Sequence, residues 1–155
     1  RQYMFGDNIL VAPILNDQGI AQYYVPEGKW TDIITGKVFE GGKWYTHECS
    51  YFEIPALAKP NSIIAYGNFV RDIEYDYLSG TNFTIYELED GKTAVAPIYD
   101  TEANKIFELK ATRNGSKIEC EYTETSASFK ISIANTDKVV EVNPSMGSGK
   151  VIIDL

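Results

Sequence analysis

Short apolar runs alternate with turn residues along the first 70 residues. The apolar run over residues 9–13 predicts a strand that is covered on both faces. Residues 20–25 predict a second strand, and Pro26-Glu27-Gly28 closes it with a turn, because proline fixes φ and glycine accepts a positive φ. Further short strands separated by glycine turns are expected up to residues 62–66. This spacing is typical of a β-sandwich.

The pattern changes between residues 67 and 76, where charged and amide side chains interrupt the apolar positions. We place a domain boundary there. Beyond it, residues 81–89 and 92–99 flank Asp90-Gly91, which predicts a two-residue hairpin. Apolar residues at 129, 131 and 133 alternate with polar ones, as in a half-buried strand. A second small β-domain is therefore expected in this half.

Asn114-Gly115 predicts another hairpin, whose register follows if these two residues form the loop. The apolar cross-strand pairs would be Ala111 with Ile118, Leu109 with Cys120, and Phe107 with Tyr122. The opposite face would pair Lys110 with Glu119 favourably and Glu108 with Glu121 unfavourably. Each such pair contributes only ~0.2–1 kcal/mol, so burial of the apolar face is expected to set the register.

Residues 139–140 and 151–153 predict the last two strands, around a hairpin turn at Gly147-Ser148-Gly149. The same glycines resemble part of a phosphate-binding loop. The upstream glycine of such a loop is missing, however, and Val151 stands where Ser or Thr would bind magnesium. A turn is the better interpretation.

Composition supports a mainly β class and sets the size. The chain has 155 residues, enough for one domain or two small ones, and 44% of them are hydrophobic. It contains 11 Tyr and 7 Phe, and aromatic and β-branched residues favour strands over helices.

The charge excludes one class of partner. The net charge is −8 and the isoelectric point is near 4.6, whereas binding to nucleic acid requires clustered Lys and Arg. No run approaches the ~20 apolar residues of a membrane span, so a membrane partner is not expected either. No signal peptide opens the chain, and its start inside a strand-turn unit suggests a fragment of a longer protein.

Cysteine and histidine are scarce. Cys49 and Cys120 fall in different expected domains, so we expect two reduced, partly buried thiols, which favours a cytoplasmic protein. With one histidine, His47, and no metal-ligand spacing, neither a metal site nor a cofactor is expected. His47 has no orienting third group and is not expected to be catalytic.

A series of short motifs in the first 67 residues resembles glycoside hydrolase family 31, which includes α-glucosidases and α-xylosidases. The similarity lies at the end of the catalytic domain and in the β-sandwich that follows it. Residues 73–155 match only in general character. The motifs, in order, are Gly6-Asp7 before Leu10-Val11-Ala12-Pro13, Tyr24-Val25-Pro26-Glu27-Gly28-Lys29-Trp30, Thr35-Gly36, Gly41-Gly42 and Lys59-Pro60-Asn61.

The resemblance implies an all-β fold of two small antiparallel β-sandwich domains, preceded by a remnant of the last strand of a (β/α)8 barrel. The expected divisions are residues 1–19 for the barrel end, 20–70 for the proximal sandwich and 71–155 for the distal sandwich. Loss of barrel contacts should then expose an apolar patch over residues 9–15.

The resemblance also implies that the whole enzyme hydrolyses α-glucosides or α-xylosides with retention, through an aspartate nucleophile and an aspartate acid/base. Such chemistry needs two carboxyl groups ~5–5.5 Å apart. The family's catalytic aspartates lie on earlier barrel strands, and no stretch here matches those motifs. No catalytic, substrate-binding or metal residue is therefore expected, and the chain would be an inactive accessory region that stabilises the missing barrel.

A few polar residues could still face a substrate. Asp7 precedes the first long strand and is interpreted as a turn residue at the stabilising end of a barrel. Asn16, Asp17 and Gln18 follow that strand and could face a substrate, although a solvated loop is the simpler interpretation.

Two alternative functions remain open, namely a carbohydrate-binding module and an oligomerisation domain of the parent enzyme. The aromatic residues motivate the first, because sugar rings stack on flat aromatic faces. Large aromatic residues also fill small cores, and we expect Trp30 and Trp44 to pack in the core or against the barrel.

Overall fold

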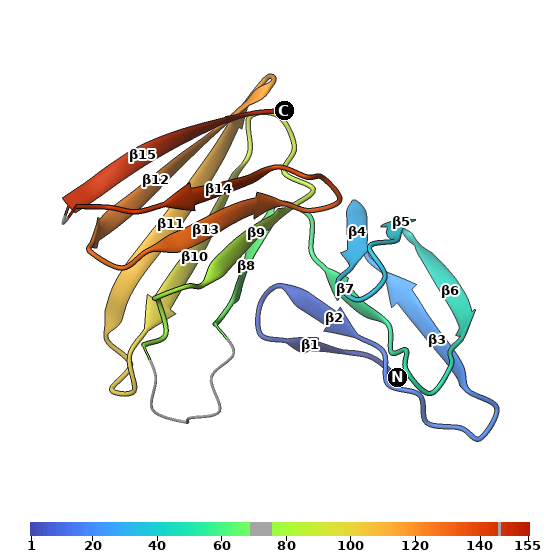
Figure 1. Cartoon of the computed structure of the whole chain (residues 1–155). Coiled ribbons are helices and arrows are strands. Elements are labelled where there is room, and N and C mark those ends of the chain that lie inside the picture. The colour runs from blue at the N-terminus through green and yellow to red at the C-terminus, as the bar shows by residue number, and fades with distance from the viewer. Residues whose placement is uncertain (69–75, 146) are drawn as a thin grey trace. The chain divides into compact units, whose positions relative to one another are not determined.

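The computed structural model describes residues 1–68, 76–145 and 147–155, and these form fifteen strands and no helix (Figure 1). The all-β expectation is confirmed. Within the described ranges there is accordingly no helix long and apolar enough to cross a bilayer. The chain divides into two compact units, residues 1–60 and residues 61–155.

The first unit contains a five-stranded antiparallel sheet and a separate two-stranded ribbon. The sheet has the order β1-β2-β7-β4-β5, and the ribbon pairs β3 with β6. The bounds of the strands are β1 Tyr3–Phe5, β2 Ile9–Val11, β3 Ile20–Val25, β4 Lys29–Asp32, β5 Val38–Glu40, β6 Lys43–Glu48 and β7 Ala56–Ala58.

The ribbon and the sheet bury one core between them. Alternation along β3 turns Ala21, Tyr23 and Val25 inward. They meet buried residues of the sheet, including Trp30 and Leu57. The side chain of Gln2 holds the free edge of the ribbon. Its amide oxygen accepts a hydrogen bond from the Tyr24 N–H at 2.7 Å, and its amide nitrogen donates one to the Tyr24 C=O at 2.9 Å.

Glycine is required where the turn between β5 and β6 approaches the turn between β3 and β4. A Cβ on Gly41 would lie 1.7 Å from the carbonyl oxygen of Pro26, and the Gly41 N–H donates to the Gly28 carbonyl at 2.8 Å. The Gly41-Gly42 motif therefore reflects a close backbone approach as well as a turn.

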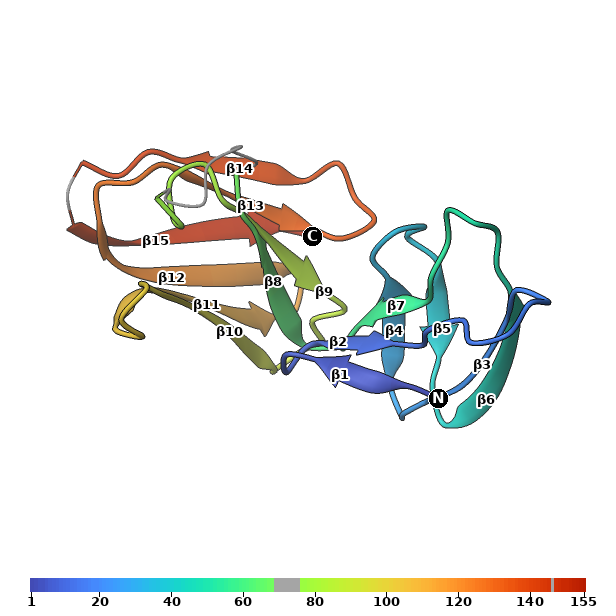
Figure 2. The same ribbon diagram turned by 90° about the horizontal axis from the view of Figure 1, so that it is seen from below.

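The second unit is a sandwich of two four-stranded sheets (Figure 2). One sheet has the order β10-β11-β12-β15 and the other β14-β13-β9-β8. The bounds of the strands are β8 Ser62–Tyr66, β9 Asn82–Tyr86, β10 Thr93–Tyr99, β11 Lys105–Asn114, β12 Lys117–Thr125, β13 Phe129–Ile133, β14 Val139–Val142 and β15 Gly147–Asp154.

An aromatic cluster occupies the middle of this sandwich. Phe83, Phe107 and Phe129 are almost fully buried, and their ring centroids lie 5.2–5.7 Å apart. They come from β9, β11 and β13, so the cluster joins the two sheets.

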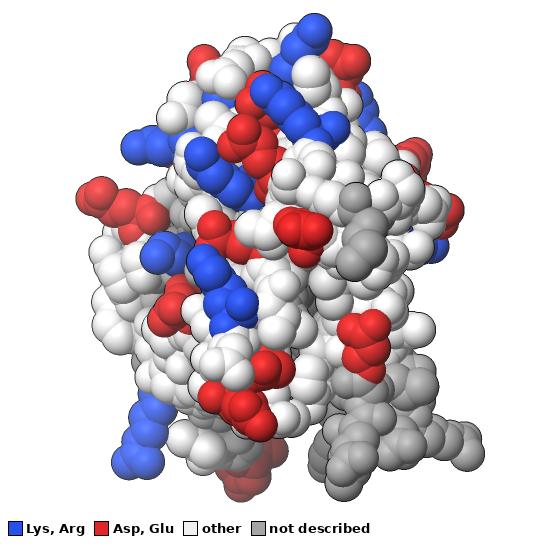
Figure 3. Space-filling model, turned by 90° about the vertical axis from the view of Figure 1, so that its left-hand side faces the viewer, with Lys and Arg blue, Asp and Glu red and all other residues white. Residues whose placement is uncertain are grey.

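Charged residues on the outside of the second unit are paired across strands. Lys110 lies 3.4 Å from Glu121, Lys130 lies 2.9 Å from Glu141, and Lys150 bonds Glu119. On the face seen in Figure 3, basic and acidic side chains are interspersed.

The expected division of the chain differs from the observed one at both of its boundaries. Residues 9–11 form β2, which lies between β1 and β7 inside the first unit and does not stand apart as a barrel remnant. The expected exposed patch is also wrong for Leu10, Val11 and Ala12, which are buried. Leu10 and Ala12 belong to the core between the sheet and the ribbon. Strand β8, expected in the proximal domain, pairs with β9 in the second unit, and much of the expected boundary region lies outside the described residues.

The β11–β12 register predicted from Asn114-Gly115 is wrong by two residues along one strand. The loop is Gly115-Ser116, and Ala111 faces Cys120 in place of Ile118. A shift of two keeps every side chain on its face. It also brings Lys110 opposite Glu121, so the expected Glu108–Glu121 repulsion does not arise.

Three other local expectations also need correction. Strands β9 and β10 belong to different sheets and form no hairpin. Gly91 N–H instead donates to Arg113 C=O at 2.9 Å, at the end of β11. The second unit is not purely antiparallel, because β13 and β9 run parallel. Gly147-Ser148-Gly149 opens β15, where Gly149 lies under the Tyr122 ring and leaves no room for a Cβ.

Candidate functional site

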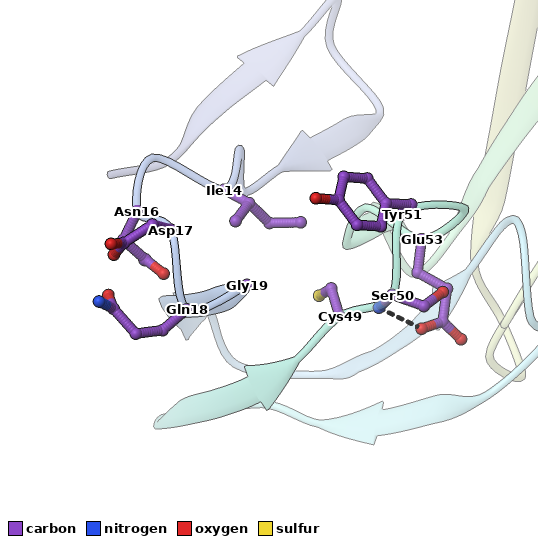
Figure 4. A pocket seen from close by; sticks show the side chains of 9 residues that line it. All are labelled: Ile14, Asn16, Asp17, Gln18, Gly19, Cys49, Ser50, Tyr51 and Glu53. Carbon is purple, nitrogen blue, oxygen red and sulfur yellow. Dashed lines mark hydrogen bonds between the residues drawn. The ribbon is translucent and has the colours of Figure 1, made fainter.

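Two neighbouring loops of the first unit enclose a pocket of about 390 Å³, called here the loop pocket (Figure 4). One loop follows β2 and the other follows β6. The residues that line the pocket are Ile14, Asn16, Asp17, Gln18, Gly19, Cys49, Ser50, Tyr51 and Glu53. Figure 4 shows Ile14 and Tyr51 pointing toward each other from the two loops.

The loop before β3 is held by its own amide side chain. Asn16 accepts a hydrogen bond from Ile20 N–H at 2.9 Å and donates to the Ile20 C=O at 2.5 Å. Gly19 C=O accepts from Cys49 N–H at 2.8 Å, which joins the two loops. Gly19 has φ +73° and its Cβ would lie 2.9 Å from the Cys49 oxygen, so only glycine fits without strain.

The second loop is closed by Glu53. Its carboxylate accepts the Ser50 N–H at 3.0 Å, and its own N–H donates to the Ser50 C=O at 3.2 Å. The hydrogen bonds from Ser50 are the main reason that the pKa of Glu53 is lowered.

Neither pKa direction matches a general acid or a thiolate nucleophile. A glycosidase acid needs a carboxyl group with a raised pKa, whereas the pKa of Glu53 is lowered. Burial, with smaller effects of Glu53 and Asp32, raises the pKa of the Cys49 thiol, so the nucleophilic thiolate is disfavoured. The arrangement is suited to contact or binding.

The loops also expose large apolar side chains. Tyr51 is 105% exposed and Phe52 92% exposed, and Leu15 on the facing loop is exposed as well. Phenylalanine has no polar atom that water could solvate, so a fully exposed Phe52 keeps a whole apolar surface in water.

A second hollow, the Trp44 groove, lies on the outer face of the β3–β6 ribbon and has a volume of about 580 Å³. Its lining residues are Arg1, Pro13, Leu15, Asn16, Ile20, Gln22 and Trp44. Trp44 is 66% exposed, whereas Trp30 is only 4% exposed. The core position expected for Trp30 is confirmed. Trp44 does not lie in the core, because it pairs with Tyr24 on the outer face of the ribbon. Packing of Trp44 against the barrel, the other position expected for it, remains a prediction.

Several residues singled out in the sequence lie in or near these hollows. Asn16, Asp17 and Gln18 come together in the loop pocket, and Asp7 lies in the turn between β1 and β2. His47 lies opposite Ala21 in the ribbon. Sequence reasoning missed the contribution of the β6–β7 loop, although the unbroken Tyr51-Phe52 pair in a polar stretch was a usable signal.

The described residues contain no group of three or more His, Cys, Asp or Glu side chains placed to hold a metal ion. The expectation of no metal and no cofactor remains a prediction from the sequence.

Comparison with known proteins identifies the family. Residues 1–64 match the glycosyl hydrolase family 31 C-terminal domain, and residues 76–155 match the C-terminal domain of α-xylosidase YicI. The α-xylosidase XylQ of Lactiplantibacillus pentosus is 38% identical over 120 residues, covering 76% of this chain and 16% of that protein. An α-xylosidase of Emericella nidulans is 30% identical over 132 residues, covering 76% of this chain and 17% of that protein.

A solved structure agrees in fold. The cycloalternan-forming enzyme of Listeria monocytogenes, in complex with a pentasaccharide substrate, has a TM-score of 0.80 at 20% identity and covers 99% of this chain and 18% of that one. The chain thus spans less than a fifth of the length of each of these proteins. It belongs to glycoside hydrolase family 31, in which it corresponds to the C-terminal region of α-xylosidase- and α-glucosidase-like enzymes.

Proposed function

We propose that this chain is the non-catalytic accessory region of a retaining α-glycosidase, which packs against the enzyme's catalytic barrel and stabilises it. The observation that carries the proposal is the fully exposed Tyr51-Phe52 pair in the first unit. Covering these side chains removes apolar area from water, at roughly 25 cal/mol per Å². A large partner in the same enzyme would supply that cover.

The chemistry of the described residues supports a non-catalytic role. Glu53 holds its own loop through Ser50. The other acidic residues with a resolved shift are Asp76, Asp100 and Glu141, and each has a lowered pKa because of hydrogen bonds to neighbouring residues. A carboxyl group of raised pKa, as a glycosidase acid requires, is not among these acidic residues.

The substrate class follows the relatives. α-Xylosidases are prominent among the proteins similar to this chain, so α-xylosides are the first candidates and α-glucosides the second. The test is hydrolysis of nitrophenyl α-xyloside and α-glucoside by the intact gene product that contains this chain. Absence of activity on both would end the enzyme half of the proposal.

The packing half has its own test. Hydrogen exchange of residues 49–54 and oxidative labelling of Tyr51 would be measured in the 155-residue chain and in the intact gene product. We expect both to slow markedly in the intact protein. Tyr99, an exposed tyrosine of the second unit, is the reference for general changes in labelling. Equal labelling of Tyr51 in both samples would contradict packing through this loop.

A second copy of the chain could cover the same surface, and this is the oligomerisation alternative. Sedimentation of the 155-residue chain separates the two cases, because a dimer that dissociates in the Phe52→Ser variant would favour self-association.

Reduced Cys49 and Cys120, which are free thiols in separate units, support our proposal of a cytoplasmic enzyme.

A further inference from the structure

The outer face of the β3–β6 ribbon has an aromatic platform that the core does not use. Tyr24 and Trp44 are direct cross-strand partners on that face, with ring centroids 5.7 Å apart and an interplanar angle of 62°. The edge-on contact with Tyr24 fixes the indole of Trp44 in place while most of it stays exposed. A rigid flat ring can bind a ligand without a large loss of side-chain entropy.

Polar groups border this platform. Gln22 is the next outward residue along β3, and Thr46, its cross-strand partner, is the next along β6. Arg1 also lines the groove. The hydrogen-bond donors of Gln22 and Arg1 bind no other side chain or backbone group in the described ranges, so they are available to a ligand.

The loop between β2 and β3 also lines the groove. Pro13, Leu15 and Asn16 contribute to the lining, and two hydrogen bonds between Asn16 and the Ile20 backbone close the end of this loop at β3. The groove, at about 580 Å³, lies within the ~300–1,000 Å³ range of small-ligand sites.

We propose that the Trp44 groove binds a sugar unit of an α-linked gluco- or xylo-oligosaccharide without cleaving it. The C–H face of a pyranose packs on the Trp44 indole, while Gln22 and Arg1 hydrogen-bond its hydroxyl groups. Since Asp and Glu are not among the lining residues, the groove binds and does not hydrolyse. The choice of ligand class rests on the proposed function.

The loop pocket is less suited to this role. Tyr51 is fully exposed, and Glu53 is engaged by Ser50. Trp44, by contrast, is held by Tyr24. We therefore assign the sugar to the groove and protein packing to the Tyr51-Phe52 loop.

The test uses the 155-residue chain and two readouts. Tryptophan fluorescence is followed during titration with maltotetraose and, separately, with a xylosyl-(α1→6)-glucose disaccharide. Sorbitol, which has hydroxyl groups but no ring face, is the negative control. We expect a saturable change with a dissociation constant of about 1 mM for at least one sugar and none for sorbitol.

Variants assign the signal to the groove. Affinity electrophoresis in gels containing soluble starch or xyloglucan reads binding without needing tryptophan. Trp44→Ala should weaken retardation roughly tenfold and Trp44→Phe less, with Gln22→Ala in between. Tyr51→Ala is the matched control and should bind as the parent chain does. All these side chains are exposed, so each variant should still fold, and Trp44→Ala should lose at most about 1 kcal/mol with its Tyr24 contact.

Three outcomes would overturn the proposal, namely no saturable response to either sugar, retardation retained in Trp44→Ala, or equal loss in Tyr51→Ala. These results are independent of the hydrolysis and labelling tests of the accessory role, because they use only this chain. Either proposal can therefore fail while the other stands.

Discussion

The two units differ in how much of its apolar surface each one buries in its own core. Among the described residues, sixteen are buried in the core of the second unit, and they include the Phe83, Phe107 and Phe129 cluster. The core of the first contains eight, and the loops of that unit expose Tyr51 and Phe52. A unit of 60 residues buries a smaller fraction of its surface than a larger one and is correspondingly marginal. The first unit is thus the one that gains from a partner.

The units carry separate reporters, which makes the comparison measurable. Both tryptophans lie in the first unit, so Trp30 fluorescence follows its unfolding. Cys120 is fully buried in the second unit, and its reaction with a thiol reagent in a Cys49→Ser background follows the opening of that unit.

The largest effect is expected from Phe83→Ala. Removing this ring leaves a cavity at the centre of the second core and should cost about 4 kcal/mol of unfolding free energy. Cys120 labelling should accelerate accordingly, while the Trp30 unfolding curve stays in place. Val95→Ala, at an exposed position of the same unit, is the control. An equal shift of both reporters would show that the units unfold together.

Gly41→Ala should be the largest glycine effect in the first unit, at about 3 kcal/mol, because the new Cβ meets the backbone oxygen of Pro26 at 1.7 Å. The neighbouring Gly42 has φ +80° and free space around its Cβ position. Gly42→Ala should therefore cost only the left-handed backbone strain, about 1 kcal/mol. Trp30 fluorescence during urea unfolding measures both, and equal costs would contradict the close approach at Gly41.

The same Tyr→Phe change should alter the unfolding free energy in opposite directions in the two units. The Tyr23 hydroxyl is buried without a hydrogen-bond partner among the described residues, and burial is the main reason that its pKa rises to about 12. Tyr23→Phe should stabilise the first unit by about 1 kcal/mol. The Tyr86 hydroxyl shares a 2.7 Å hydrogen bond with Tyr66. Tyr86→Phe should destabilise the second unit by about 1 kcal/mol. The denaturation midpoints of the two variants test this contrast, and a shift of both midpoints in the same direction would contradict it.

Acid should have the smallest effect and should act mainly on the second unit. In the second unit the pKa values of Asp76, Asp100 and Glu141 are lowered. In the first unit the carboxyl group with a lowered pKa is that of Glu53. A carboxyl group with a lowered pKa contributes stability above its unfolded pKa of about 4, and this is lost as pH falls through the folded value. Cys120 protection, read at each pH with a pyridyl disulfide that reacts with thiols in acid, should therefore decline below about pH 4. In Asp76→Asn the decline should be shallower, and an identical profile would contradict the role of Asp76.

Local sequence patterns predicted many strands correctly. Residues 20–25 alternate and form β3 with the expected bounds, and residues 129–133 form β13. In both cases the period of two directs one set of side chains to a core, and that signal is contained in the segment itself. The loop that contributes Tyr51 to the loop pocket gave no such signal, because a pocket depends on which loops the fold brings together.

Strand partners were predicted less well, for a physical reason. Asp90-Gly91 forms a tight turn, yet the chain passes there from one sheet to the other, and Asp90 accepts the Gly115 N–H at 2.6 Å. Nothing within residues 81–99 encodes this partner. The β11–β12 register was missed by two residues because either register buries the same face.

The sequence by itself determined the all-β class, the periodicity of the strands, the position of Trp30 in the core and the resemblance to family 31, since each depends on residues close together in the chain. The tertiary structure alone decided the pairing of β8 with β9, the parallel β9–β13 contact, the place of residues 9–11 inside the first unit and the exposure of Trp44. Each of these depends on which distant strand occupies a neighbouring edge, and burial of a whole face, not any local signal, selects that strand.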